Sequence, residues 1–245
     1  DILSYKNEAG EYVIDLIQDR AGQKGTGKWT GIEALEQGVP LTLVVEAVFA
    51  RLLSSLKDTR VEAAKLYGIN PLQIDKAAIN ISDLRDALYA AKIVSYAQGF
   101  MLMKQSSELN SWDLQYGDIA MVWRGGCIIR SVFLGKIKAA YETNPELENL
   151  LLDPYFVNEI KKSLAGWRKT CALAQSSGIP IPCISSGLAF FDGFISERLP
   201  ANLLQAQRDY FGAHTYERID KPAGEFFHTN WTGHGGSTSA STYNV

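Results

Sequence analysis

A glycine-rich turn near the start of the chain carries residues suited to holding an anion. Residues 22–30 read GQKGTGKWT, which places Lys24, Thr26 and Lys28 among three glycines. Glycine allows the backbone to approach an anion closely, and exposed N–H groups can form a nest for it. The lysine and threonine side chains add a charge and a hydroxyl donor. The turn therefore fits a bound phosphate, although a solvated basic turn in front of a helix would have the same composition.

The same turn nearly matches the nucleotide-binding P-loop pattern G-x-x-x-x-G-K-[ST], but Trp29 stands where that pattern has a Mg²⁺-binding hydroxyl. A P-loop also requires a strand before it and a helix after it. Residues 12–17, YVIDLI, are the one short strand candidate, and they could equally begin a helix. A P-loop kinase is therefore the least favoured interpretation.

Arg51 is a second candidate for binding an anion. It lies in the apolar stretch EAVFARLLSSL, residues 46–56, where we expect a helix with buried neighbours. Charged residues in such surroundings are usually paired or bind a ligand. Glu46 lies five residues earlier, which is a poor spacing for a pair on one helix face. A bound ligand and an interhelical salt bridge both remain open for Arg51.

Arg208 and His214 form a third candidate, near the end of the last expected helix in the sequence QRDYFGAH. An arginine and a histidine near one helix end could face one ligand, and arginine can hold a phosphate through two parallel hydrogen bonds. Surface or structural roles remain the alternative. His214, His228 and His234 show no metal-ligand spacing, so no metal is expected.

Helices are expected to position these side chains. Apolar spacing and helix breakers predict helices over residues 30–38, 40–67, 82–109, 116–142, 153–178 and 185–214. Thr30 and Glu33 have the spacing of a capping box, and Gly68 is expected to end the second helix. The paired glycines at 125–126 are a weak point of the fourth helix, and Pro200 interrupts the last one.

The composition is that of a folded chain with one large domain or two small ones, with 245 residues, 46% hydrophobic and 21% charged. A net charge of −3 gives no reason to expect nucleic acid as a partner. No apolar run approaches the roughly 18–20 residues that span a bilayer, so no membrane partner is expected. Three cysteines without a secretory signal indicate reduced thiols and a cytoplasmic location. Because the chain does not begin with Met, we expect a processed product or a piece of a longer polypeptide.

The last part of the chain differs in character from the rest. Residues 215–245 are rich in Gly, Ser and Thr and show no helical period. A merely disordered tail would not be expected to carry Phe226, Phe227, Trp231 and Tyr243. We therefore expect this tail to pack on another surface, such as a neighbouring subunit.

Four stretches carry a family resemblance: DRAGQKGTGKWT, EAVFARLLSSLKDTRVEA, MVWRGGCIIRSVFLGKI, and QRDYFGAHTYERID followed by FFHTNWTGHGG. In order and at compatible spacing over nearly all 245 residues, they closely resemble the C-terminal half of 6-phosphogluconate dehydrogenase. The resemblance implies an all-α fold in which a large multi-helix domain with an internal helical repeat spans residues 1–214. It also implies an extended tail, residues 215–245, exchanged into the partner subunit of a homodimer. The N-terminal Rossmann domain of the family is absent from this sequence.

The resemblance also implies an activity. Enzymes of this family oxidise 6-phosphogluconate with NADP and decarboxylate it to ribulose 5-phosphate, in the pentose phosphate pathway and in gluconate utilisation. The Rossmann domain binds NADP, and the lysine and glutamate that act as base and acid lie before the segment present here. Since the sequence also lacks a G-x-G-x-x-G fingerprint, we expect no turnover from this chain alone. The alternative is a non-catalytic helical dimerisation module.

By motif, the resemblance assigns substrate contacts to the residues described above. Lys24 and Thr26 would contact the substrate phosphate from the glycine-rich turn. Arg51 would hold the same phosphate from its helix. Arg208 and His214 would reach into the partner's active site and complete the substrate pocket across the interface.

The resemblance assigns a cofactor contact to the end of the tail. Ser241, Thr242 and Tyr243 resemble the segment that approaches the NADP of the partner subunit. Ala240 stands where the family often has a serine. Trp29, in contrast, is the usual residue at its position in the family, which accounts for the mismatch with the P-loop pattern.

Overall fold

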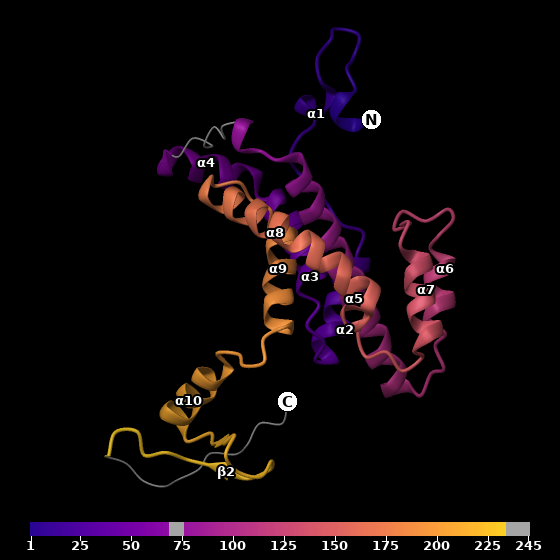
Figure 1. Ribbon diagram of the computed structural model, residues 1–245. Coiled ribbons are helices and arrows are strands. Elements are labelled where there is room, and N and C mark those ends of the chain that lie inside the picture. The colour runs from indigo at the N-terminus through magenta and orange to yellow at the C-terminus, as the bar shows by residue number, and fades with distance from the viewer. Residues whose placement is uncertain (69–75, 234–245) are drawn as a thin grey trace. The chain divides into compact units, whose positions relative to one another are not determined.

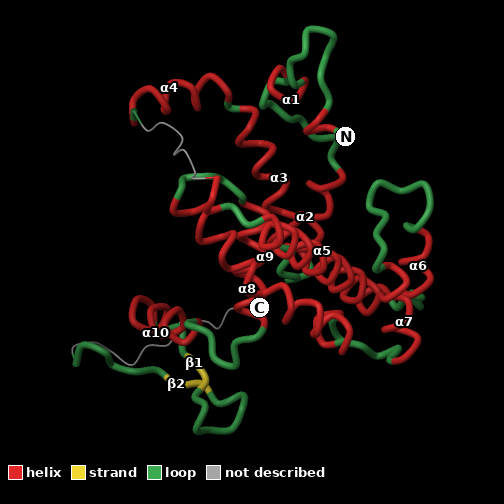
Figure 2. The backbone as a smooth tube through the Cα atoms, turned by 45° about the horizontal axis from the view of Figure 1, so that its top comes forward, coloured by secondary structure: helices red, strands yellow, loops and turns green. Residues whose placement is uncertain are grey.

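The described residues of the computed structural model, 1–68 and 76–233, form an almost entirely helical fold. Figure 2 shows helices joined by loops, with two short strands. The helices are α1 (Val13–Leu16), α2 (Thr26–Glu36), α3 (Thr42–Ser55), α4 (Lys57–Tyr67), α5 (Ile81–Asn110), α6 (Tyr116–Val122), α7 (Leu134–Thr143), α8 (Pro154–Ser176), α9 (Pro182–Phe194) and α10 (Ala201–Gly212). Short 3-10 helices span Ile2–Ser4, Lys76–Ala78 and Leu150–Leu152, and the strands are β1 (Tyr216–Glu217) and β2 (Phe226–Phe227). The prediction of an all-α fold is confirmed.

The chain divides into two compact units, Asp1–Phe191 and Asp192–Val245. This boundary falls near the end of α9, so helix α10 belongs to the same unit as the tail. The functional division at residue 214 expected from the sequence remains a prediction. Within residues 1–68 and 76–233, every helix is too short or too polar to cross a bilayer.

The core of the first unit forms where α5 and α8 pack along each other (Figure 1). One face of α5 carries apolar residues at helical spacing, most of them small, and all of them are buried: Ala87, Ala90, Ala91, Val94 and Ala97. Gly166 of α8 faces this helix, and a Cβ at that position would lie 3.0 Å from Cα of Asp83. The small side chains therefore let the two helix backbones approach each other closely.

Trp167 of α8 connects this core to α9. Its side chain is fully buried, and its Nε1–H donates to the carbonyl of Ile184 at 3.1 Å. Gly187 of α9 leaves room for the indole, since a Cβ there would lie 3.4 Å from Cζ2 of Trp167. The same Cβ would lie 2.9 Å from Cδ1 of Leu43, so α9 also packs closely against α3.

Helix α3, which carries Arg51, is held at its first turn by Gln98 of α5. The Gln98 side chain is fully buried, and its Oε1 accepts the backbone N–H of Leu43 at 3.0 Å. Its Nε2 donates to Oγ1 of Thr42 at 2.9 Å. The first N–H groups of a helix lack partners within the helix, so Gln98 satisfies one of them and positions α3 on the core.

The single helix expected over residues 40–67 is wrong, because α3 and α4 are separated at Leu56. The hydroxyl of Ser54 donates to a carbonyl one turn earlier at 2.7 Å, a pattern that bends helices. The guanidinium of Arg60 donates to the Ser54 carbonyl at 3.1 Å, at the point where the helix is interrupted. Gly68 ends α4 as expected, with a left-handed φ of 60°.

Residues 116–142 also form two helices, α6 and α7, where one was expected. The break contains the paired glycines at 125–126, and Gly126 has a φ of 69°. The loop is tied to α5 because the hydroxyl of Tyr96 donates to the carbonyl of Ile129. The Tyr96 ring also lies 5.0 Å, between centroids, from Phe133. The predicted weak point of the helix is thus a complete break.

The helix start expected at Thr30 is wrong. Helix α2 begins at Thr26, and Oγ1 of Thr30 donates to the Thr26 carbonyl inside the helix at 2.9 Å instead of capping it. Gly25 is the N-cap with a φ of 107°, a conformation that glycine adopts at little cost. Residues 12–17 fit either a strand or the start of a helix by sequence, and they contain the short helix α1. Tyr12, just before this helix, forms an isolated antiparallel bridge with Lys6.

The described part of the second unit consists of α10 and a short antiparallel hairpin. In the hairpin, Tyr216 pairs with Phe227 and Glu217 pairs with Phe226. The helix expected over residues 185–214 is interrupted near Pro200, as predicted, and forms α9 and α10. The tail thus begins with a small folded hairpin and is not extended throughout.

Candidate functional site

The glycine-rich turn, residues 22–30, is held against α3. The hydroxyl of Ser54 accepts a hydrogen bond from the Ala21 N–H at 2.9 Å. The guanidinium of Arg51 donates to the carbonyl of Gly22. These two contacts bring Arg51, a predicted site residue from one stretch of sequence, beside the turn predicted from another stretch.

Asp19 anchors the chain just before the turn. Its Oδ2 lies 3.0 Å from Nη2 of Arg60, and its other oxygen pairs with Nζ of Lys57. The hydrogen bonds from Lys57 and Arg60 lower the pKa of the Asp19 carboxyl to about 2. A carboxyl with a lowered pKa keeps its charge at a more acidic pH than an ordinary aspartate, so this anchor is intact throughout the neutral range.

Two glycines bring α2 close to α3. A Cβ at Gly27 would lie 2.8 Å from Cγ2 of Val48, and one at Gly31 would lie 3.2 Å from Cγ2 of Val45. A larger residue at either position would push α2 away from α3. The glycines of the turn therefore serve packing as well as backbone conformation, and they keep the first turn of α2 next to the helix of Arg51.

The start of α2 is suited to holding an anion. Its first N–H groups, beginning with that of Thr26, have no partner within the helix, and the N-cap residue Gly25 has no side chain to cap them. A helix start of this kind favours negative charge. Lys24 is exposed on the same turn and adds a positive charge. A phosphate bound here would meet backbone N–H groups, a hydroxyl, an ammonium group and the guanidinium of Arg51.

Trp29 packs against the glycine-rich turn at Gly25. Its ring packs over Gly25, where an added Cβ would lie 3.6 Å from Cζ2, and 63% of Trp29 is exposed.

Within residues 1–68 and 76–233, no group of three or more His, Cys, Asp or Glu could hold a metal ion. The strand that a P-loop requires is replaced by α1, so the structure gives the kinase interpretation no support.

The expectation that Arg51 has buried neighbours is wrong for this chain. Arg51 is itself exposed, and Phe49 and Leu53 on α3 are 57% and 59% exposed. No carboxylate of the described residues forms a salt bridge with Arg51, whose contact is with the Gly22 carbonyl. Its positive charge is therefore available for an anion.

In the second unit, Arg208 lies on α10 and His214 lies just beyond the end of that helix. Nη1 of Arg208 donates to Oε1 of Gln205 at 2.9 Å. The His214 ring packs over Gly212, where an added Cβ would lie 2.7 Å from Nε2. Both predicted site residues therefore lie near one end of α10.

Asp209 is a buried residue that the sequence analysis did not identify. Its carboxylate accepts hydrogen bonds from the backbone N–H groups of Thr215 and Thr229 and from the side chains of His228 and Trp231. Burial raises the pKa of Asp209, but these hydrogen bonds outweigh burial and lower it overall. A single acidic residue in a polar helix gives no sequence signal of burial, because charged residues are mostly exposed.

The cofactor contact expected at the end of the tail lies outside the described residues. This applies to Ser241, Thr242 and Tyr243, to the departure at Ala240, and to His234. The role of these residues toward NADP therefore stays a prediction.

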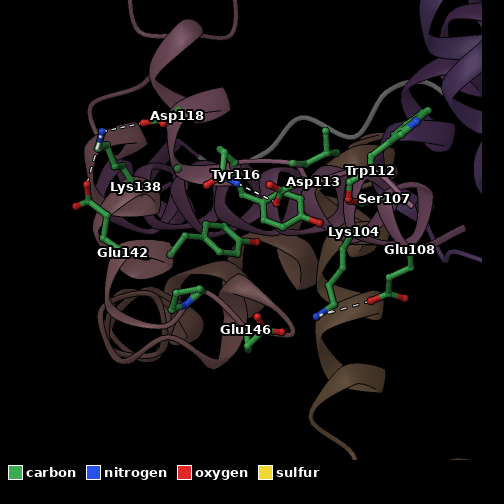
Figure 3. Close-up of a pocket in the computed structure, with 15 residues that line it drawn as sticks. Lys104, Ser107, Glu108, Trp112, Asp113, Tyr116, Asp118, Lys138, Glu142 and Glu146 are labelled. Carbon is green, nitrogen blue, oxygen red and sulfur yellow. Dashed lines mark hydrogen bonds and ion pairs between the residues drawn. The ribbon is translucent and has the colours of Figure 1, made fainter. Parts of the chain in front are cut away.

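The first unit contains a cavity of about 560 Å³ between the end of α5 and helices α6 and α7 (Figure 3). Its two lysines are already paired. Lys138 lies 2.9 Å from Asp118 and 3.6 Å from Glu142, and Lys104 lies 3.9 Å from Glu108. Further carboxylates line the same space. An acidic cavity with neutralised cations would repel a sugar phosphate, so it does not compete with the glycine-rich turn as a phosphate site.

A family model described as "6-phosphogluconate dehydrogenase, C-terminal domain" matches residues 1–231 of the chain. The "6-phosphogluconate dehydrogenase, decarboxylating" of Haemophilus influenzae is 59% identical over 247 residues, covering 100% of this chain and 51% of that protein. The human protein of the same description is 56% identical over 247 residues, with the same coverage. The chain therefore spans about half the length of the curated relatives it matches.

A solved structure from Plasmodium falciparum has a similar fold, with a TM-score of 0.87 and 46% sequence identity. The similarity covers 94% of this chain and 50% of that chain. That protein is described as 6-phosphogluconate dehydrogenase in its apo form, in complex with its cofactor NADP⁺ and in complex with its substrate 6-phosphogluconate. The sequence comparisons and the structure comparison thus agree that the chain is similar to one half of 6-phosphogluconate dehydrogenases.

Proposed function

Because this chain belongs to the 6-phosphogluconate dehydrogenase family, of which it matches the C-terminal domain, we propose that it forms the substrate-binding and dimerisation part of an NADP-dependent enzyme. That enzyme oxidises 6-phosphogluconate and decarboxylates it to ribulose 5-phosphate, in the pentose phosphate pathway and in gluconate utilisation. The proposed location is the cytoplasm. The observation that carries the proposal is the contact of Arg51 with the glycine-rich turn.

The glycine-rich turn and Arg51 together suit a sugar phosphate for electrostatic and geometric reasons. A phosphate carries nearly two negative charges at neutral pH. Lys24 and Thr26 from the turn and Arg51 from α3 provide two positive charges and a hydroxyl donor for it. Arginine has a planar fork of donors, so Arg51 can bind the Gly22 carbonyl and a phosphate oxygen at once. Fixing the phosphate end of a flexible sugar acid positions its far end for reaction, and such positioning can supply several kcal/mol of the barrier reduction.

In the proposed homodimer, Arg208 and His214 of one subunit complete the substrate pocket of the other. The exposed apolar side chains near them support this proposal. Leu204 and Phe211 on α10 are 61% and 82% exposed, and Trp231 in the tail is 46% exposed. Exposed apolar patches of this kind commonly mark protein–protein contact sites.

NADP would accept the hydride removed from the substrate. The described residues of this chain do not fit a dinucleotide, because they contain no glycine fingerprint at a strand-to-helix turn. We therefore assign NADP binding mainly to the part of the enzyme outside this chain. Ser241, Thr242 and Tyr243 are proposed to approach the cofactor of the partner subunit.

A direct test compares the 245-residue chain with the longer polypeptide that contains it. The longer polypeptide is expected to form NADPH and release CO₂ when 6-phosphogluconate is added, as followed by NADPH fluorescence. The chain alone is expected to form none, because hydride acceptor binding and proton transfer are assigned elsewhere. NADPH formation by the purified chain, or its absence with the longer polypeptide, would contradict the proposal.

A non-catalytic helical dimerisation module is the second candidate. The exposed apolar face of α3, with Phe49 and Leu53, would suit such a role. A dimerisation module, however, would have no need for a charged residue to be held at a glycine-rich turn. Thermal stabilisation of the dimer by 6-phosphogluconate separates the two candidates, since only the substrate-binding protein would show it.

A further inference from the structure

We propose that Asp209 is a positioning residue for the substrate contacts of Arg208 and His214, acting through the turn that follows α10. This inference rests on the proposed function, because it concerns how two proposed substrate ligands are held. It assigns to a buried carboxylate a role in ligand geometry that the sequence motifs do not indicate.

The Asp209 carboxylate is surrounded by donors and is 1% exposed. Its Oδ1 lies 3.0 Å from the backbone nitrogen of Thr215 and 2.9 Å from Nδ1 of His228. Its Oδ2 lies 3.0 Å from the backbone nitrogen of Thr229 and 2.9 Å from Nε1 of Trp231. A carboxylate only accepts hydrogen bonds, so Nδ1 of His228 must carry its hydrogen. The four hydrogen bonds therefore require both carboxylate oxygens of Asp209 to act as acceptors.

Asp209 accepts hydrogen bonds from the two residues that flank His214. Its backbone carbonyl accepts the N–H of Ala213 at 2.8 Å, and its carboxylate accepts the N–H of Thr215. Ala213 and Thr215 have left-handed φ values of 50° and 58°. These values are unfavourable for residues other than glycine, and most of all for a β-branched residue such as Thr215. The hydrogen bonds to Asp209 compensate for this conformation, and so they hold the backbone on both sides of His214.

Asp209 also fixes the end of α10 that carries Arg208. The two residues are adjacent in the helix, so they project in different directions. His228, Thr229 and Trp231 hold the buried Asp209 side chain against the hairpin. The rotation of this helix end is thereby set, and with it the direction in which Arg208 leaves the helix.

The first experiment substitutes Asp209→Asn in the full-length dimer. Asparagine keeps the size of the side chain but offers an NH₂ group where two donors need an acceptor. We expect the KM for 6-phosphogluconate to rise about tenfold, as for the loss of a charge-assisted hydrogen bond, with a smaller change in kcat. Asp220→Asn is the matched control, because Asp220 lies in the same unit and pairs only with exposed Arg218 among the described residues. It should leave KM unchanged.

A double-mutant cycle distinguishes positioning from general destabilisation. If Asp209 acts through Arg208 and His214, the effect of Asp209→Asn on KM should largely disappear in a background that carries both Arg208→Ala and His214→Ala. Equal effects in both backgrounds, or a loss of kcat at unchanged KM that follows a loss of folded dimer, would overturn the inference. If the Asp209→Asn protein does not assemble, Trp231→Phe removes one donor to Asp209 and should give a smaller KM rise that depends on Arg208 and His214 in the same way. An inactive wild-type dimer would instead contradict the proposed function.

Discussion

Substituting Arg51→Ala is expected to weaken binding of 6-phosphogluconate by about 10- to 150-fold, which is the usual range for losing a hydrogen bond to a charged group. The guanidinium is exposed, lies at the glycine-rich turn and forms no salt bridge with a carboxylate of residues 1–68 or 76–233. Its loss removes one of the charges proposed to hold the phosphate. Isothermal titration of the full-length protein with 6-phosphogluconate measures the change. Arg51→Lys should recover part of the affinity, because lysine keeps the charge but not the planar fork.

A control is needed because Arg51 also binds the Gly22 carbonyl, so its removal could loosen the turn. Ser54→Ala removes the other hydrogen bond between α3 and the turn, at Ala21, and leaves the charge in place. We expect Ser54→Ala to weaken binding far less than Arg51→Ala. Unphosphorylated gluconate should bind equally to wild type and Arg51→Ala. Equal losses for the two variants would mean that Arg51 acts only on the turn.

Substituting Trp167→Ala is expected to cost about 3–5 kcal/mol of stability, the usual range for removing a large buried aromatic side chain. The indole is fully buried and donates to the Ile184 carbonyl between α8 and α9. Its removal leaves a cavity and a carbonyl without its donor. At about 2–4 °C per kcal/mol for a chain of this size, the melting temperature should fall by about 6–20 °C. Differential scanning calorimetry gives the value.

Two other substitutions serve as controls for the loss of stability expected from Trp167→Ala. Trp167→Phe keeps most of the ring volume and loses only the N–H donor, so its melting temperature should fall much less. Trp112→Ala removes a tryptophan that is 55% exposed and should have little effect. If Trp167→Ala melted like Trp112→Ala, the packing of α8 against α9 described here would be incorrect.

The helices could be predicted from sequence where their signals are local. Asp153 before Pro154 marks the start of α8, and its side chain does accept the first N–H groups of that helix. Gly68 likewise ends α4 by its own conformational freedom. The break between α3 and α4 could not be predicted in this way. It depends on Arg60, whose guanidinium binds both Asp19 and the Ser54 carbonyl.

The same distinction between local sequence signals and contacts of distant residues applies to the candidate site. Lys24 and Thr26 could be proposed as candidates because glycines and a charge within a few residues form a recognisable anion-binding turn. Arg51 could be proposed because a charge in an apolar stretch is unusual, although the burial expected around it is not present in this chain. Their roles toward a phosphate stay predictions. The anchors Ser54 and Asp209 could not, since their roles come from hydrogen bonds to distant backbone groups that leave no pattern in the sequence.

We propose that side chains from the glycine-rich turn and from α3 converge on one phosphate group. A crystal structure of the full-length protein with 6-phosphogluconate tests this proposal most directly. We expect phosphate oxygens at hydrogen-bond distance, about 2.7–3.2 Å, from Lys24, Thr26 and Arg51. A phosphate bound elsewhere, with these three side chains in contact only with solvent or protein, would contradict it.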